Sequence, residues 1–176
     1  MRMASKIPGL FRGNRLREIG RLLVIALSLA IALLVNFRLF GTPFVDAVSR
    51  WTAVSAAGAL NALGASVVNT GTIVGSSSFA YNVVAECTAI GPIILFAGAV
   101  LAYQATWRSR LVGISMGVVL LSALNLVRLV SLFYIGAYFP NYLPMAHYLV
   151  WQAAIILFAI LLWLFWADRL TGRAHG

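Results

Sequence analysis

The sequence is poor in charge: Asp, Glu, Lys and Arg together make up 10% of its 176 residues. A soluble domain carries about 25%. Hydrophobic residues reach 62%, and the mean hydropathy is +0.95. This composition excludes an ordinary soluble domain and indicates a surface that faces mostly lipid. At this length we expect one compact membrane domain with no second, soluble one.

Cysteine and histidine are also scarce, with one Cys and two His in the chain. A single cysteine, Cys87, excludes an internal disulfide. A zinc site needs about four N, S or O ligands, which this chain could hardly supply on one face. We therefore expect no metal and no cofactor. The lone thiol is either an inert core residue or a nucleophile.

Acidic residues number only four against 13 Lys and Arg, which gives a formal net charge of +9. Such an excess can indicate nucleic-acid binding, but the basic residues here lie beside apolar runs. They cluster before the first run, between two later runs, and after the last: Arg2, Lys6, Arg12, Arg15, Arg17, Arg21, Arg108, Arg110, Arg169 and Arg173. This placement is typical of cytoplasmic flanks held by anionic lipid. It favours membrane lipids over nucleic acid as partners.

The apolar runs predict an all-α polytopic membrane protein with about four transmembrane helices. The later runs each reach the ~20 residues needed to cross ~30 Å of hydrocarbon. We place the spans at residues 22–37, 87–107, 111–138 and 147–167. The first has no obvious small-x-small site behind it, which favours a retained signal anchor over a cleaved signal peptide.

Between the first two spans, residues 41–86 are predicted to form an external segment. Residues 41–64 are weakly apolar and read as an amphipathic or interfacial helix. Strand formers broken by Asn-Thr-Gly and Gly-Ser-Ser-Ser predict a short β-hairpin over residues 65–85. The chain then divides into a basic cytoplasmic N-terminus (1–21), one membrane-embedded catalytic domain (22–167) and a cytoplasmic tail (168–176).

Charge placement also predicts the topology. With the N-terminal cluster inside, four spans put the arginines after spans two and four in the cytoplasm, together with both chain ends. A fifth span at residues 51–68 would strand those arginines outside. The protein is thus expected in the cytoplasmic (inner) membrane, with residues 41–86 facing outside.

This topology brings three unusual residues to one leaflet. Cys87 lies at the outer mouth of the second span and His147 at the outer mouth of the last. Arg128 lies about 26 Å along the third span, in its outer third. A cysteine or histidine alone would be unremarkable there. An arginine inside the hydrocarbon costs about 2.5–3.5 kcal/mol on insertion scales, so it marks a site by default.

The chemistry of these three residues fits acyl transfer. A thiolate is the working nucleophile, and a helix N-terminus, a cation and an imidazole each favour it. Ionised Glu86, next to Cys87, would act in the opposite direction. A Cys–His pair suffices for acyl transfer, and an arginine can hold the oxyanion of the tetrahedral intermediate.

Three motifs also carry a resemblance: Glu86-Cys87-Thr88-Ala89-Ile90, then Asn125-Leu126-Val127-Arg128, then His147 at the head of the last span. Their order and membrane setting resemble the exosortase/archaeosortase family, and the short chain is similar to compact types such as exosortase H. These are membrane transpeptidase-like cysteine enzymes with Cys-[Ser/Thr]-[Gly/Ala], Asn-x-x-Arg and His on successive membrane segments. The resemblance covers roughly residues 65–150.

The resemblance implies Cys87 as nucleophile, His147 as acid and base, and Arg128 as a clamp on the oxyanion or substrate carbonyl. Asn125, Glu86 and Thr88 would support them, with Asn125 orienting Arg128 from three residues away on the same helix face. The implied partners are exported proteins that end in a short motif, an apolar helix and a basic cluster. Cleavage through a Cys-linked acyl intermediate would pass the new C-terminus to an acceptor.

Two other functions stay open at the level of sequence. In a transporter or assembly subunit without enzymatic activity, Arg128 would be a counter-charge and Cys87 dispensable. A different membrane cysteine hydrolase would act on lipids or lipoproteins. Hydrolysis and transpeptidation share the acyl-enzyme and differ only in what attacks it, so the residues alone do not separate them.

Overall fold

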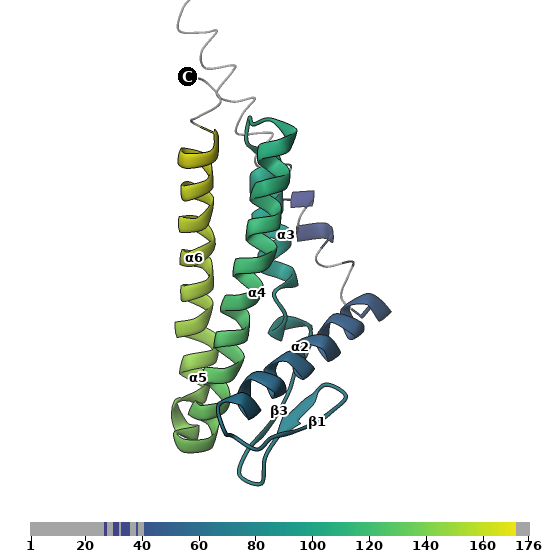
Figure 1. The fold of residues 1–176 in the computed structure, drawn as a ribbon, viewed down its shortest axis with the longest axis vertical. Helices are drawn as coiled ribbons and strands as arrows, with labels where there is room; N and C mark the ends of the chain where they lie inside the picture. Colours follow the sequence, from purple (N-terminus) through teal and green to yellow (C-terminus); the bar gives the residue numbers. More distant parts are fainter. Residues whose placement is uncertain (1–26, 28–29, 32, 36–37, 39–40, 172–176) are drawn as a thin grey trace, which may run out of the picture.

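The computed structural model describes residues 27, 30–31, 33–35, 38 and 41–171 (Figure 1). The basic N-terminus, most of the first predicted span and residues 172–176 lie outside the described residues. Helices dominate the described part, and a small sheet lies beside them. The longer helices are α2 (Pro43–Ala62), α3 (Ile90–Ala102), α4 (Trp107–Tyr138) and α6 (Trp151–Trp166).

Two helical segments of the described part are long and apolar enough to cross a membrane: α4, and the continuous run Pro140–Arg169. That run joins a 3₁₀ turn (Pro140–Tyr142), α5 (Leu143–Met145), a π turn (Ala146–Val150), α6, and most of a second π turn (Ala167–Thr171). They match the third and fourth predicted spans by length and composition.

Four spans are not confirmed. The first predicted span lies largely outside the described residues. The second contains only α3, whose 13 residues rise about 20 Å, short of ~30 Å of hydrocarbon. Its helix begins late because a 3₁₀ turn occupies Ala85–Cys87, and it ends at Tyr103, which has extended backbone.

The predicted amphipathic helix is present as α2. Thr42 caps it by accepting a hydrogen bond from the N–H of Val45 at 3.5 Å, and Pro43 occupies the first turn. One face is buried through small residues and a few larger ones: Val45, Ser49, Ala53, Ala56, Ala57 and Leu60. The other face exposes large apolar side chains, among them Phe44, Trp51 and Val54.

The predicted hairpin was one strand too small. The segment forms a three-stranded antiparallel sheet in the order β1 (Val68–Thr70), β2 (Ile73–Gly75), β3 (Ala80–Asn82). Both predicted breaks are turns between strands, so the segment has three strands where a hairpin has two. In the serine run, the N–H of Ser76 donates to the Phe79 carbonyl at 2.8 Å, and the chain turns back so that β3 pairs with β2.

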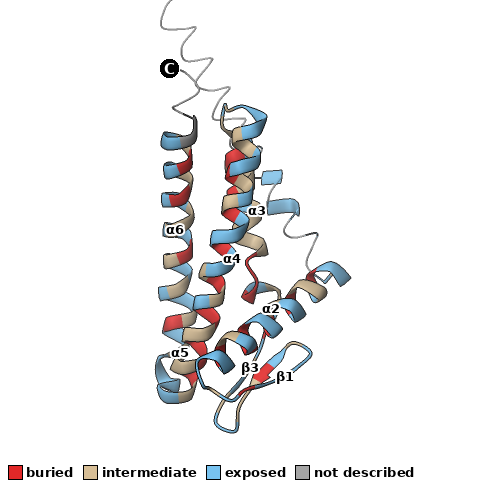
Figure 2. Ribbon diagram, viewed as in Figure 1, coloured by how far each residue is buried: buried red, intermediate tan, exposed pale blue. Residues whose placement is uncertain are grey.

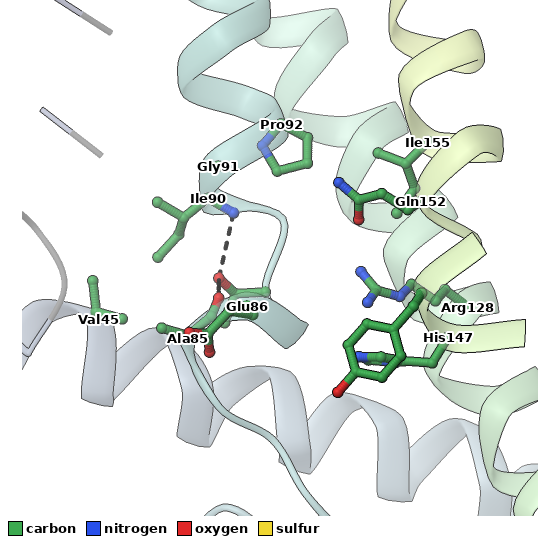
Figure 3. A pocket seen from close by; sticks show the side chains of 12 residues that line it. Val45, Ala85, Glu86, Ile90, Gly91, Pro92, Arg128, His147, Gln152 and Ile155 are labelled. Carbon is green, nitrogen blue, oxygen red and sulfur yellow. Dashed lines mark hydrogen bonds between the residues drawn. The ribbon is translucent and has the colours of Figure 1, made fainter. Parts of the chain in front are cut away.

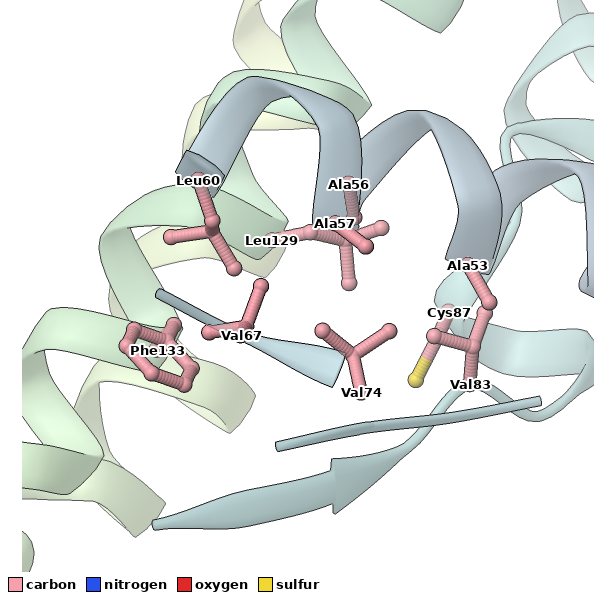
Figure 4. Close-up of a cluster of buried hydrophobic side chains, with 10 residues drawn as sticks. All are labelled: Ala53, Ala56, Ala57, Leu60, Val67, Val74, Val83, Cys87, Leu129 and Phe133. Carbon is pink, nitrogen blue, oxygen red and sulfur yellow. The ribbon is translucent and has the colours of Figure 1, made fainter. Parts of the chain in front are cut away.

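The buried side chains form two clusters along the molecule (Figure 2). The first joins α2, the sheet, the Cys87 turn and the C-terminal part of α4 (Figure 4): Ala53, Ala56, Ala57, Leu60, Val67, Val74, Val83, Cys87, Leu129 and Phe133. The second joins α3, α4 and α6: Phe96, Val100, Leu121, Leu162 and Trp166. The sheet and α2 are thereby fixed against one end of the helices, where the candidate site lies.

Candidate active site

Cys87 ends the 3₁₀ turn Ala85–Cys87, directly before α3. Its N–H donates to the carbonyl of Val84 at 2.8 Å, and the Thr88 hydroxyl donates to the Ala85 carbonyl at 2.7 Å. The same hydroxyl accepts from the N–H of Ile90 at 3.4 Å (Figure 3). Thr88 therefore fixes the turn to the beginning of the helix.

The Cys87 side chain is 8% exposed and belongs to the first buried cluster. Its sulfur lies beside Val83 and Ala53, between α2 and the sheet (Figure 4). In this state the thiol is shielded from water by apolar groups.

Asn125 joins this turn to α4. Its Nδ2 donates to the Cys87 carbonyl at 2.8 Å, and both residues are buried. We expected Asn125 to orient Arg128; the hydrogen bond that its amide makes goes to the cysteine backbone instead. Two motifs that lie 38 residues apart are thus held together by one buried hydrogen bond.

Arg128 lies one turn further along α4 and is 5% exposed. Among the described residues it forms no ion pair, and its buried Nε has no hydrogen-bond partner. A buried cation without a partner is costly, because it has lost water and gained no counter-charge. Its guanidinium interacts electrostatically with both Cys87 and His147.

His147 lies in the π turn Ala146–Val150 at the head of α6. Its ring meets the ring of Tyr148 edge to face, with 4.6 Å between centroids. Single π turns inside helices are rare and occur frequently at functional sites. Figure 3 shows the His147 ring beside the Arg128 side chain.

A cavity of about 340 Å³ lies between the Cys87 turn and α6 (Figure 3). Four of the residues singled out from the sequence line it, namely Glu86, Thr88, Arg128 and His147. Cys87 does not line it, because its side chain turns to the opposite side of the 85–88 segment. The rest of the lining is mostly apolar: Val45, Ala85, Ile90, Gly91, Pro92, Tyr148, Gln152 and Ile155.

Two residues of this region were missed from the sequence. Gln152 lines the cavity one turn after Tyr148. It is the only amide side chain in residues 147–167, and this could have drawn attention to it.

Tyr81, on β3, packs against the cluster that holds Cys87, and its buried hydroxyl has no hydrogen-bond partner among the described residues. Burial raises the pKa of Tyr81 to about 12, with a smaller contribution from a charge on Cys87. The hydroxyl therefore stays protonated near neutral pH and can donate a hydrogen bond.

A family model described as transmembrane exosortase (Exosortase_EpsH) matches residues 17–167. The matched range holds the Cys87 turn, the Asn125–Arg128 turn of α4 and His147. Comparison with curated proteins and with solved structures gives no match.

Proposed function

This chain belongs to the transmembrane exosortase family, and on this premise we propose that it is a membrane cysteine peptidase or transpeptidase. It acts outside the cytoplasmic membrane on the C-terminal sorting signals of exported proteins. The resemblance seen in the motifs is confirmed at the level of the family. The substrate class, the reaction and the residue roles below belong to the proposal.

The observation that carries the proposal is the buried hydrogen bond from Asn125 to the Cys87 carbonyl. It holds the turn with the only thiol against the helix that carries Arg128. On the far side of the same cavity lies His147. A cation and an imidazole thus line one cavity, and the turn that carries the thiol borders it. Arg128 lacks an ion-pair partner within the described part of the chain.

In the first step, the Cys87 proton passes to His147 and the thiolate attacks the scissile carbonyl carbon. A C–S bond forms, and the carbonyl electrons move to oxygen, where the Arg128 guanidinium donates hydrogen bonds to the oxyanion. Collapse of this intermediate breaks the C–N bond. The leaving amine takes the proton from His147 and departs with the apolar helix and basic tail of the substrate.

In the second step, an acceptor amine or water attacks the Cys87 thioester while His147 takes its proton. The second tetrahedral intermediate collapses, the C–S bond breaks, and the thiolate is regenerated. An amine gives transpeptidation and water gives hydrolysis.

The first step requires the thiol to move. Since Sγ packs beside Ala53 and Val83, it must rotate about the Cα–Cβ bond to reach the cavity. Cysteine has three staggered rotamers, and a change between them is the smallest movement that redirects the sulfur. We propose that substrate binding drives the rotation.

The experiment uses a secreted reporter fused to the C-terminal segment of an exported protein that ends in a short motif, an apolar helix and a basic cluster. Co-expression with the wild-type enzyme should shorten the reporter. Cys87→Ala and Cys87→Ser should insert normally and leave it uncut, whereas Ser77→Ala, at an exposed turn, should process it normally.

Mass spectrometry of the wild-type enzyme under acceptor-poor conditions should find the reporter's new C-terminus as a thioester on Cys87. Normal processing by Cys87→Ala would exclude the nucleophile and favour a transporter or assembly subunit. An adduct that carries lipid instead of the reporter would favour a lipid or lipoprotein hydrolase.

A further inference from the structure

The two outer edges of the sheet differ in how their backbone groups are used. In an antiparallel pair, alternate residues face the neighbouring strand with their N–H and C=O groups. Val83 donates to Thr72, Phe79 accepts from Ser76, and Tyr81 is paired with Val74. The backbone groups of the residues between them, Ala80 and Asn82, therefore point away from β2.

On the β1 side of the sheet, a side chain covers the outward backbone groups of Val67, the residue before β1. The N–H of Val67 donates to Oδ1 of Asn61 at 2.7 Å, and Nδ2 of Asn61 donates to the Val67 carbonyl at 3.1 Å. One amide of α2 thus occupies both outward backbone groups of Val67.

The outer edge of β3 has no such cover within the described residues. Ala80 and Asn82 are exposed, and their outward N–H and C=O groups form no hydrogen bond to another described residue. The next outward position is Val84, whose carbonyl accepts the N–H of Cys87 at 2.8 Å. The free edge therefore leads directly into the turn that carries the thiol.

We propose that the substrate binds as an extended strand on the β3 edge, pairing its main chain with Ala80 and Asn82. This inference rests on the proposed function and names the form in which that site takes its polypeptide. An unpaired edge is a template for another strand, and such pairing gives affinity through main-chain hydrogen bonds. From Asn82 to Cys87 the chain spans at most about 17 Å, so at most about five substrate residues bridge the edge and the scissile bond.

The occupant is polypeptide because of the spacing of the free groups. Donor and acceptor pairs recur at every second residue of β3, which matches the repeat of an extended peptide. Recognition then depends on the substrate backbone at alternate positions. It is largely indifferent to the side chains there.

The first test modifies the substrate alone, so the folding of the enzyme is not at issue. The starting point is a reporter that the wild-type enzyme cleaves. Its C-terminal segment is synthesised as a series of peptides, each with one N-methylated amide, and each peptide is ligated to the reporter. The modified residues are the ten on either side of the scissile bond, so that the scan reaches past the bridging residues to those that pair with β3. Wild-type enzyme in liposomes should lose about tenfold in kcat/KM at alternate residues on one side only, since each methyl removes one hydrogen bond and crowds the edge.

The second test modifies the enzyme. Asn82→Pro removes one outward N–H and leaves the bonds to β2, because proline is tolerated at outward positions of edge strands. Asn82→Ala keeps that N–H and serves as the matched control. We expect the proline variant to raise KM about tenfold relative to the alanine variant, with kcat nearly unchanged in both. Thermal unfolding in detergent checks that both are folded.

A loss of kcat/KM on methylation of consecutive residues, or of none, would overturn the strand addition. The proposed function would still stand in that case, because the unmodified reporter is cleaved. Equal loss in both Asn82 variants would assign recognition to the side chain and overturn the main-chain pairing. If no segment is cleaved and no adduct forms on Cys87, the proposed function is wrong, and so is the proposal that the substrate binds to the β3 edge.

Discussion

Asn125 is the residue whose role changed most between sequence and structure. It sits at a buried position of α4 and holds the backbone of the turn that carries Cys87. If that carbonyl loses its donor, it becomes a buried acceptor without a partner. Such groups cost about 1–3 kcal/mol.

Asn125→Ala should therefore lower the free energy of unfolding by about 1–3 kcal/mol and slow reporter cleavage, because the turn loses its fixed position. Exposed Asn141, in the turn after α4, gives the matched control, and Asn141→Ala should leave both quantities unchanged. Unfolding in detergent measures the change in stability, and single-turnover cleavage of the reporter measures the change in rate. A variant that cleaves at the wild-type rate would show that the bond serves folding only.

Arg128 allows a clamp to be distinguished from a counter-charge. Arginine offers a rigid planar fork of donors, whereas lysine is a compact charge on a flexible stem. Loss of one oxyanion donor costs about 10²–10³ in rate. We expect Arg128→Lys to insert normally and to lose at least about a hundredfold in kcat. If the kcat of Arg128→Lys stays within a few fold of wild type, Arg128 acts only as a positive charge and not as an oxyanion clamp.

Tyr81 predicts an alkaline limit to stability. Its folded pKa of about 12 lies above the ordinary value of 10.0, so the folded state holds its proton more tightly than the unfolded state. The contribution of the Tyr81 proton to the free energy of unfolding is fully present below pH 10 and is lost as the pH rises towards 12. Tyr81→Phe should be at least as stable as wild type at pH 8 and lose less stability between pH 10 and 12. Parallel melting curves of the two proteins against pH would disprove this.

Single residues could be selected from the sequence where their rarity was informative. Cys87 is the only thiol, Arg128 the only charge inside its span, and both lie beside the cavity or at it. The partner of Asn125 and the isolation of the Tyr81 hydroxyl could not be predicted. Both depend on how α4 and the sheet meet, which local sequence does not encode.

Among the elements, α4 is the one that the others pack against. The closest of these contacts lie at glycines of α4. A Cβ at Gly117 would overlap the buried ring of Phe96 on α3, and one at Gly113 would overlap Trp166. Trp166 also donates from Nε1 to the Ser109 carbonyl at 2.9 Å. These glycines let side chains of α3 and α6 lie directly on the α4 backbone.

Gly117→Ala should destabilise the protein by about 1–3 kcal/mol, the usual cost of overpacking. Gly58, on the exposed face of α2, has nothing within 4 Å of an added Cβ. Gly58→Ala should instead stabilise by about 0.5–1 kcal/mol through helix propensity. Thermal unfolding in detergent compares them, and a neutral Gly117→Ala would contradict the close contact.

At this scale the hydropathy pattern predicted α4 and the last helix well, because long apolar runs leave few alternatives. It overestimated α3, since Cys87 and Tyr103 fit an apolar run and yet lie outside the helix. The third strand and the π turn at His147 depend on hydrogen bonds beyond the reach of a periodicity argument.

The whole molecule has an orientation that reporters can test. Because basic residues flank the ends of α4 and α6 away from the sheet, that end should face the cytoplasm. A reporter after Gly176 should read cytoplasmic, and one inserted at Ser77 should read external. A cytoplasmic signal at Ser77 would place the cavity on the wrong side for exported substrates.

The shortness of α3 has a consequence for the lipid around it. A helix of about 20 Å, with Leu95 and Leu101 exposed, borders hydrocarbon that is normally ~30 Å thick. Bilayers relieve such hydrophobic mismatch by thinning locally. An apolar helix of ordinary length that diffuses into the thinned zone protrudes from it by up to about 10 Å. In the proposed orientation, the peptide bonds at the outer end of such a substrate helix would be lifted out of the lipid beside the Cys87 turn, and local thinning would help to present them for cleavage.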